Sequence, residues 1–377
     1  MTRDHSSAYG IAERDTPTGA EKVEVADLRS FLSALFTAAS YRPDDAELVA
    51  DSLTDADARG ITSHGCIRTR VYVERVRSRL VDPQAVPDVS GAGAAVSVSG
   101  NNAPGHVAAL AGVQAVTNRA LDTGVSVAGV SGSNHCGTLG YFLRRIAAEG
   151  LVGIATSNGP AVMAYHGGRT RAVGTNPFGF AVPRAQRAPI VLDMATSATA
   201  RGKIIQAART GETIPEQWAV DVNGKPTADP AAALAGAVVP FAGAKGSGLA
   251  MMVELLCGAM VTGATGPAIG DMYEQWDRPQ NVGHFFLALD PTVWTDHGTD
   301  LATRAGEFSE WVHDLPAASG NRGVLLPGEP EEEALQTAHR HGLTLPGEVV
   351  SDLRTLAEEL DLGRTLHSVP SDERSRT

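Results

Sequence analysis

The turn around His135 holds the residues of this chain that are best suited to proton transfer beside a bound anion. It follows an apolar run, residues 125–130, and precedes a helical pattern that begins near Leu139, so a strand, a turn and a helix are predicted. The turn is rich in candidate capping residues: Ser131, Ser133, Asn134 and Thr138. The free N–H groups of such a helix start favour phosphate or carboxylate, and a histidine beside them can exchange a proton with the bound molecule. The segment therefore predicts a small-molecule site.

A second group of reactive side chains lies earlier in the chain. Arg68 and Tyr72 are four residues apart, so on a helix they share a face, and Ser63 and His64 lie in the turn that leads into it. This spacing places a fixed cation, a phenol and an imidazole together. The alternative is that Arg68 only solvates a helix surface, which is the commoner role of a single arginine.

Two further side chains lie at the ends of predicted elements. Asp193 ends an apolar strand and is followed by small residues, which is typical of a catalytic or ligand-binding carboxylate; it could equally cap the following helix or pair with an arginine. Lys245 lies in a glycine-rich turn before a nearly all-round apolar helix, which the pattern predicts to be buried in the core. The lysine could meet a phosphate there or stay exposed.

The elements that must position these groups give an α/β pattern. Helices are expected at residues 25–40, 44–60, 106–122 and 200–210, with Gly211 closing the last of these. Strands are expected at residues 125–130, 151–157, 190–193 and 284–291, and short strands and turns at 88–98. Beyond residue 291 the chain becomes helical and charged.

Length and composition limit the class of protein. A chain of 377 residues is long enough for two lobes with a cleft between them. The net charge of −12 is spread along the sequence, which argues against a nucleic-acid partner. Three cysteines, Cys66, Cys136 and Cys257, are too few for a disulfide framework. No signal-type apolar region is found near residue 1, and the apolar run 249–261 is too short to span a bilayer. We therefore expect a cytoplasmic protein without a membrane partner.

Standard motifs of other functional classes are missing from the sequence. Neither glycine-rich stretch, at residues 91–96 or 240–248, has the spacing of a Rossmann fingerprint or a phosphate loop. No G-x-S-x-G elbow frames a serine, which argues against a hydrolase triad of Ser63, His64 and Asp193. His135, Cys136 and His166 match no metal-ligand spacing, so no metal site is predicted. A nucleotide-binding protein without turnover is disfavoured because it has no need for the reactive side chains described above.

Taken together and in order, the motifs resemble a known family. They are Ser63-His64-Gly65 with Arg68 and Tyr72, Asn134-His135-x-Gly137, Gly174-Thr175-Asn176-Pro177, Leu192-Asp193-Met194-Ala195-Thr196, Gly202-Lys203, Pro215 with Trp218, Lys245-Gly246-x-Gly248, and Asn281-x-Gly283-His284. Over roughly residues 23–329 the chain resembles the type 2 malate/L-lactate dehydrogenases, a family that includes ureidoglycolate and sulfolactate dehydrogenases and the Δ1-piperideine- and Δ1-pyrroline-2-carboxylate reductases. The resemblance implies an α/β fold whose nicotinamide-binding sheet is not of the Rossmann type, NAD or NADP as cofactor, and a homodimer.

The resemblance also implies roles for individual residues. His135 matches the proton acceptor of ureidoglycolate dehydrogenase, and Ser63, His64 and Asp193 match a relay of the imino acid reductases, so either histidine could be the principal acid or base. Arg68, with Tyr72 beside it, matches the arginine that binds the substrate carboxylate, and Thr175 matches a substrate contact. The cofactor would contact His135, Cys136, Gly137, Thr138, Leu139, Asn158 or Gly159, Asp193, Met194, Ala195, Lys245, Gly246, Pro327, Gly328 and Glu329.

These implications predict an NAD(P)-dependent oxidoreductase that transfers hydride between nicotinamide and C2 of a small 2-hydroxy or 2-oxo carboxylate. A histidine would exchange the hydroxyl proton, and Arg68 would orient C2. The alternative is reduction of a cyclic 2-imino acid: residues 271–274 and 281–283 resemble the ureidoglycolate and malate branch, whereas Pro240-Phe241 and Ser247 resemble the imino acid reductases.

The predicted regions are residues 1–21 as a disordered extension, 22–124 as a helical substrate-side region, 125–290 as the nicotinamide-binding α/β domain and 291–377 as a mainly helical region.

Overall fold

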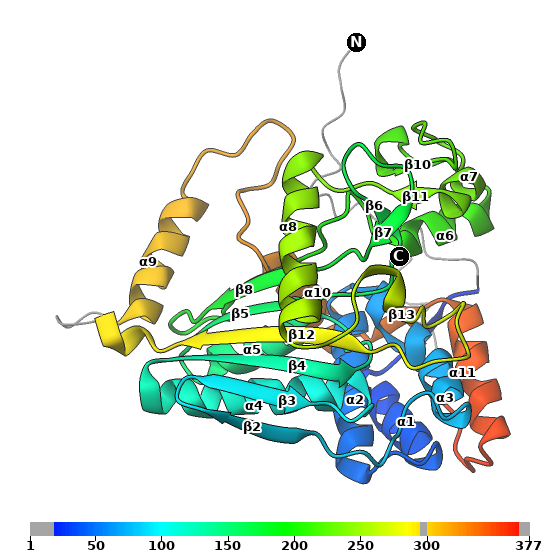
Figure 1. Ribbon diagram of the computed structural model, residues 1–377, viewed down its shortest axis with the longest axis horizontal. Coiled ribbons are helices and arrows are strands. Elements are labelled where there is room, and N and C mark those ends of the chain that lie inside the picture. Colours follow the sequence, from blue (N-terminus) through cyan, green and yellow to red (C-terminus); the bar gives the residue numbers. More distant parts are fainter. Residues whose placement is uncertain (1–18, 295–299, 369–377) are drawn as a thin grey trace, which may run out of the picture.

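A seven-stranded sheet forms the centre of the molecule (Figure 1). The structure is a computed structural model that describes residues 19–294 and 300–368. The strand order is β2 (Asp88–Ala92), β3 (Ala95–Ser99), β4 (Val125–Ser133), β12 (Val282–Leu289), β5 (Val152–Ser157), β8 (Phe178–Val182) and β9 (Ile190–Met194). Within this sheet β3 and β4 pair in parallel, and the other neighbours are antiparallel. A doubly wound dinucleotide-binding sheet is mostly parallel, so the prediction of an α/β fold with a non-Rossmann sheet is confirmed.

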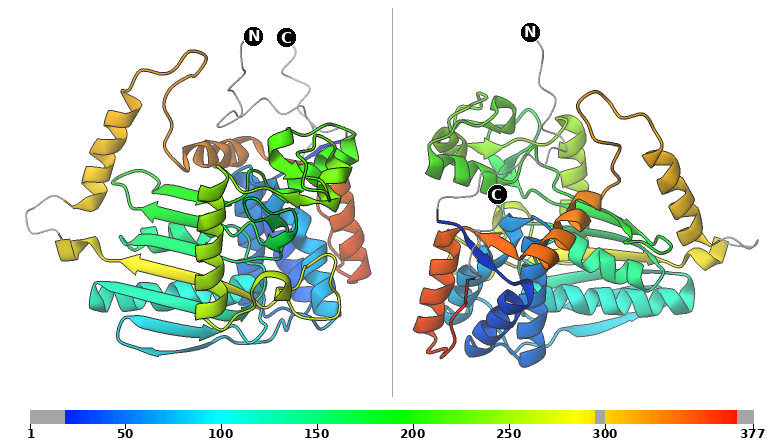
Figure 2. Two further views of the ribbon diagram at one scale, coloured as in Figure 1. Left: turned by 45° about the horizontal axis from the view of Figure 1, so that its top comes forward. Right: turned by 180° about the vertical axis from the view of Figure 1, so that it is seen from behind.

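The two faces of this sheet are covered differently. Helices α4 (Gly105–Thr123) and α5 (Leu139–Ala148) pack on one face, where Phe142 and Phe286 lie in a fully buried apolar core. Alternation along β12 turns the half-buried Phe285 to the other face. That face is crossed by α8 (Ala244–Glu254), which continues as a π-helical turn, Leu255–Met260 (Figure 2).

A helical unit is built from both ends of the described chain. It contains α1 (Val25–Ala38), α2 (Pro43–Ala58), α3 (Thr69–Arg77), α10 (Glu329–His341) and α11 (Gly347–Glu359). β1 (Glu21–Val23) pairs with β13 (Leu343–Leu345), and apolar residues of α1, α2 and α11 share one core. α9 (Leu301–His313) lies apart from this unit, beyond the sheet (Figure 1).

A small third unit lies above one end of the central sheet in Figure 1. Its sheet has the order β10 (Ala219–Val220), β11 (Ala237–Val238), β6 (Met163–Ala164) and β7 (Arg171–Val173). Helices α6 (Arg201–Thr210) and α7 (Pro230–Ala235) complete it. Short 3-10 turns lie at Thr62–His64, Cys66–Arg68, Glu216–Trp218, Gly266–Ala268 and Pro291–Trp294.

Most elements expected from the periodicity are present. The strand, turn and helix around His135 are β4 and α5, and Gly211 takes the left-handed conformation that ends α6. Strands β2 and β3 fall within the region 22–124, and the proposed boundary at residue 124 separates β3 from its parallel neighbour β4. The four proposed ranges stay a proposal; residues 1–18 of the first lie outside the described residues, and Glu21 already belongs to β1.

The prediction that the apolar helix after Lys245 is buried in the core is wrong. One side of α8 is buried, but Leu249, Met251 and Met252 are exposed, as are Leu255 and Met260 in the π-helical turn. The reason is that α8 lies on the outer face of the sheet, and no described part of the chain covers its other side. Among the described helices none has the length and hydropathy needed to cross a membrane.

Candidate active site

The turn that carries Ser63 and His64 is fixed from below by a buried carboxylate. Asp57, in the last turn of α2, accepts a hydrogen bond from the N–H of Cys66 with Oδ2 at 2.7 Å. A β-carbon at Gly65 would come within 1.9 Å of Asp57 Oδ1, so this approach requires glycine. Burial raises the pKa of Asp57 to about 6, although the N–H of Cys66 opposes the rise.

His64 and His135 form a pair of stacked imidazoles. Their ring centroids are 5.5 Å apart and their planes are inclined by 24°. The Nδ1 atom of each ring has a hydroxyl partner: Ser63 Oγ lies 2.9 Å from His64 Nδ1, and Tyr72 Oη lies 2.6 Å from His135 Nδ1. Burial, with the charge of Arg68, lowers the pKa of His64 to about 3 and that of His135 well below its ordinary value. Both rings are therefore neutral at physiological pH.

The surroundings of His135 select one tautomer. Besides Tyr72, the N–H of Gly137 points at Nδ1 from 3.3 Å. With two donors facing it, Nδ1 acts as the acceptor, and the proton of the neutral ring resides on Nε2. Gly137 has φ +80°, and a β-carbon there would come within 2.9 Å of His106 Nε2. The backbone N–H of His135 donates to Gln280 Oε1 at 3.1 Å.

Arg68 reaches this pair from the start of α3. Its Nε donates to the Ser63 carbonyl at 2.7 Å, and Nη1 donates to the Tyr273 hydroxyl. The guanidinium also lies 5.4 Å from the centre of the Tyr273 ring. Nη2 makes no hydrogen bond to the described residues. Arg68 thus does more than solvate a helix surface, and it keeps a donor edge for an anion.

Asp193 hydrogen-bonds the start of α5. Its Oδ2 accepts the N–H of Gly140 at 2.7 Å, at the start of α5. Burial raises its pKa, while the N–H of Gly140 and the charge of Arg144 oppose the rise. In the described part of the chain Asp193 makes no hydrogen bond to Ser63 or His64. It interacts with a helix start, as one alternative expected, but with that of the preceding helix α5, where it accepts the N–H of Gly140.

The segment from Val191 to Thr196 connects several parts of the predicted cofactor site. The N–H of Val191 donates to the Pro327 carbonyl at 3.1 Å, and a β-carbon at Gly328 would come within 3.0 Å of Val191 O. The N–H of Thr196 donates to the Thr175 carbonyl at 2.8 Å. Phe241, just before the Lys245 turn, donates to the Thr196 carbonyl at 3.0 Å. Met194 and Ala195 are half-buried within this segment.

Several predicted cofactor residues have side chains with other contacts. Cys136 and Leu139 are buried in the core beneath the sheet, so the turn offers a ligand their backbone only. Asn158 donates from Nδ2 to Ala264 O, and its Oδ1 accepts from Gly283 N, both at 2.9 Å. Glu329 is paired with Arg184 and His313. Thr138 makes no side-chain cap on α5, Gly246 is buried, and Lys245 is exposed at the start of α8. Among the described residues, no group of three potential ligands could hold a metal ion.

Known proteins are similar to this chain in sequence and in fold. The sequence model of the family described as malate/L-lactate dehydrogenase matches residues 23–354. The chain belongs to the malate/L-lactate dehydrogenase family. It is 38% identical over 314 residues to the (2R)-3-sulfolactate dehydrogenase (NADP(+)) of Chromohalobacter salexigens, covering 83% of this chain and 91% of that one. It is 34% identical over 345 residues to the Δ1-pyrroline-2-carboxylate reductase of Ancylobacter novellus, covering 89% and 97% of the two chains. The crystal structure of a dehydrogenase from Sinorhizobium meliloti superimposes with a TM-score of 0.83 at 30% identity, covering 89% of this chain and 98% of that one. As a member of this family, the protein is a dehydrogenase or reductase that acts on hydroxy acids or imino acids.

The site of this malate/L-lactate dehydrogenase family member includes side chains that sequence reasoning missed. Tyr273 holds Arg68, and Gln280 bridges His135 to the Gly270 carbonyl, to which its Nε2 donates at 3.3 Å. Arg75 is fully buried and donates to the carbonyls of Met272, Gln275 and Arg278 at 3.0–3.3 Å. Of these three residues, only Arg75 could have been predicted from the sequence, because it lies two helical turns after Arg68 and so shares its face of the helix.

Proposed function

We propose that the protein transfers a hydride between a nicotinamide cofactor, NAD or NADP, and C2 of a small 2-hydroxy or 2-oxo carboxylate. The observation that carries the proposal is the stacked pair of neutral imidazoles with Arg68 beside it. A carboxylate on Arg68 would be oriented by the Nη2 edge, and His135 would face the reacting oxygen with the proton on Nε2.

His135 and Tyr72 together can deliver that proton. In reduction, Nε2 gives its proton to the oxygen on C2, and Nδ1 takes the proton of the Tyr72 hydroxyl at 2.6 Å, so the ring stays neutral. A proton from water then restores the Tyr72 hydroxyl, because burial raises the pKa of Tyr72 well above its ordinary value and disfavours the phenolate. Oxidation follows the same path backwards. Ser63 and His64 form a second hydroxyl–imidazole pair whose role we take to be substrate positioning.

The residues present fit a dinucleotide. When bound, its nicotinamide would supply or accept the hydride. Lys245 is an exposed cation at the start of α8, and its position suits a phosphate of the cofactor. The start of α5 suits a phosphate less well, because Asp193 already accepts the N–H of Gly140 there. The rest of the cofactor would be held by the backbone of the Pro327–Gly328 turn and by the half-buried Met194 and Ala195.

Reduction of a cyclic 2-imino acid is the second candidate function. It is supported by the 2.9 Å contact between Ser63 and His64, which would form the start of the relay implied by the resemblance. Asp193, the third member of that relay, hydrogen-bonds α5 instead. We therefore favour the hydroxy or oxo acid.

We further propose that the protein is a cytoplasmic homodimer. The exposed apolar side of α8, with Leu249, Met252 and Leu255, is the surface that a second copy would cover. The three cysteines are free and buried, which suits a reducing compartment.

The proposal is tested by following nicotinamide absorbance. NADH and NADPH are each offered with pyruvate, oxaloacetate, sulfopyruvate, Δ1-pyrroline-2-carboxylate and Δ1-piperideine-2-carboxylate, and the oxidised cofactors with lactate, malate and ureidoglycolate. Turnover of an oxo or hydroxy acid that His135→Ala abolishes supports the proposal. Turnover of the cyclic imines alone favours the second candidate, and failure to bind either cofactor overturns both.

A further inference from the structure

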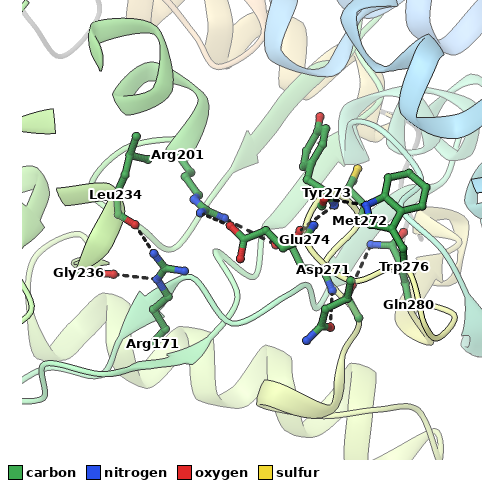
Figure 3. Close-up of polar contacts among 12 residues, drawn as sticks. Arg171, Arg201, Leu234, Gly236, Asp271, Met272, Tyr273, Glu274, Trp276 and Gln280 are labelled. Carbon is green, nitrogen blue, oxygen red and sulfur yellow. Dashed lines mark hydrogen bonds and ion pairs between the residues drawn. The ribbon is translucent and has the colours of Figure 1, made fainter. Parts of the chain in front are cut away.

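Besides Arg75, two arginines from different elements contact the loop of residues 271–280 with their side chains. Arg68 donates to the hydroxyl of Tyr273. Arg201, the first residue of α6, pairs with the next residue along, Glu274, at 2.9 Å and lies 3.6 Å from Asp271 Oδ2 (Figure 3). Tyr273 and Glu274 are consecutive residues, so the two arginines contact neighbouring side chains of one loop.

Arg201 also lies next to the turn that carries His64. A β-carbon at Gly202 would lie 3.7 Å from the β-carbon of Ser63. The carbonyl of Ser63 in turn accepts the Nε hydrogen bond of Arg68. Arg201 therefore precedes, within the small third unit, the residue that faces Ser63, whose carbonyl holds Arg68.

The two carboxylates around Arg201 are held very differently. Asp271 accepts the N–H groups of Tyr273 and Glu274 at 2.7 and 2.9 Å, and its side chain is 16% exposed. Glu274 is 57% exposed, and its side chain contacts Arg201 only among the described residues. An exposed ion pair of this kind contributes little stability. Asp271 thus fixes the arginine, whereas Glu274 can leave it.

Arg171 shows what a purely structural arginine looks like in the same region. Its Nε donates to the Gly236 carbonyl at 2.8 Å, and its Nη2 donates to the Leu234 carbonyl (Figure 3). Its partners are thus backbone atoms of the small unit, which cannot be exchanged. Arg201, in contrast, has an exchangeable carboxylate partner at the edge of the site.

We propose that Arg201 is a specificity-determining residue that binds a second anionic group of the substrate, a carboxylate or sulfonate, in place of Glu274. This inference rests on the proposed function, in which Arg68 binds the carboxylate next to C2. It assigns the protein a 2-hydroxy or 2-oxo acid with an acidic group at its far end. When a substrate with a single carboxylate binds, Glu274 stays paired with Arg201, and Arg201 adds nothing to the affinity for that substrate.

The test compares substrates with and without the second anion in matched variants. For oxaloacetate and sulfopyruvate, Arg201→Gln lowers kcat/KM by about 10- to 100-fold, the loss expected for one charged hydrogen-bonding partner. For pyruvate it changes kcat/KM by no more than about twofold. Glu274→Gln removes the competing anion and lowers KM for the two-anion substrates only. Arg209→Gln, at the other end of α6 with an exposed partner, Glu348, is the control.

Binding gives an independent readout. Malate and lactate are titrated by calorimetry into the protein with reduced cofactor present, where no reaction follows. The inference is supported if the wild-type protein binds malate more tightly than lactate, if Arg201→Gln removes this difference and if Arg201→Lys partly restores it. This result would support the inference even if no substrate is turned over; in that case only the proposed function fails. Equal losses of affinity for malate and lactate in Arg201→Gln would mean that Arg201 is only a structural link. If Arg201→Gln does not fold, the inference is overturned when Glu274→Gln and Arg201→Lys keep the wild-type preference for malate over lactate.

Discussion

Replacing Tyr72 by phenylalanine tests the proton path at a single atom. The change removes the hydroxyl that lies 2.6 Å from His135 Nδ1 and leaves the longer contact from Gly137 N–H at 3.3 Å. A neutral hydrogen bond contributes about 1 kcal/mol to stability, so the variant should fold with a small loss. Proton transfer by a positioned group contributes about 10²- to 10⁴-fold to rate, and we expect kcat to fall by about 10²-fold.

Arg68 is unchanged in this variant, so KM for the carboxylate substrate should stay within about twofold. The assay is nicotinamide absorbance under single-turnover and steady-state conditions. Tyr41→Phe is the matched control, because Tyr41 is a buried tyrosine of the same helical unit and, among the described residues, makes no hydrogen bond to His135. The reasoning is refuted if Tyr72→Phe keeps the wild-type kcat, or raises KM while leaving kcat unchanged.

Three further changes have expected outcomes. Arg68→Gln should raise KM for the carboxylate substrate by about 10- to 100-fold, measured by initial rates, whereas an unaltered KM would place the carboxylate elsewhere. Burial raises the pKa of Asp57 from 3.8 to about 6, so the folded protein binds this proton more tightly than the unfolded chain. The resulting contribution to the free energy of unfolding, up to about 3 kcal/mol, is complete below about pH 4 and is lost as the pH rises through 6. Asp57→Asn should flatten this decline in urea titrations at several pH values, and an unchanged decline would assign it to other groups. Leu255→Glu, on the exposed side of the π-helical turn, should shift the protein from dimer to monomer in analytical ultracentrifugation, whereas a dimer of unchanged stability would place the interface on another face.

The sequence patterns correctly predicted those features that depend on neighbouring residues in the chain. The apolar run, the small polar residues and the helical period around His135 gave β4, the turn and α5, and Gly211 marked the end of α6 because a left-handed residue favours glycine. Tyr72 and Arg68 could be placed near one another because both belong to the start of one helix.

The remaining features depend on contacts between distant residues. Tyr273 meets Arg68 across 205 positions, and Gln280 meets His135 across 145, so no spacing in the sequence indicates either pair. Asp193 was recognised as a strand-end carboxylate, but which helix it would interact with depends on the order of strands in the sheet. The apolar sequence of α8 predicted a buried helix, and it could not show that one side would stay exposed on the outer face of the sheet.

Deuteride transfer is the most direct test of the proposed chemistry. The protein is supplied with reduced nicotinamide cofactor carrying deuterium at both C4 positions and with the 2-oxo acid that it turns over best, and the product is analysed by mass spectrometry and NMR. We expect deuterium at C2 of a single enantiomer of the 2-hydroxy acid, with the label lost in His135→Ala because turnover stops. Product without deuterium at C2, or labelled product of both hands, would contradict direct hydride transfer to a substrate oriented by Arg68 and His135.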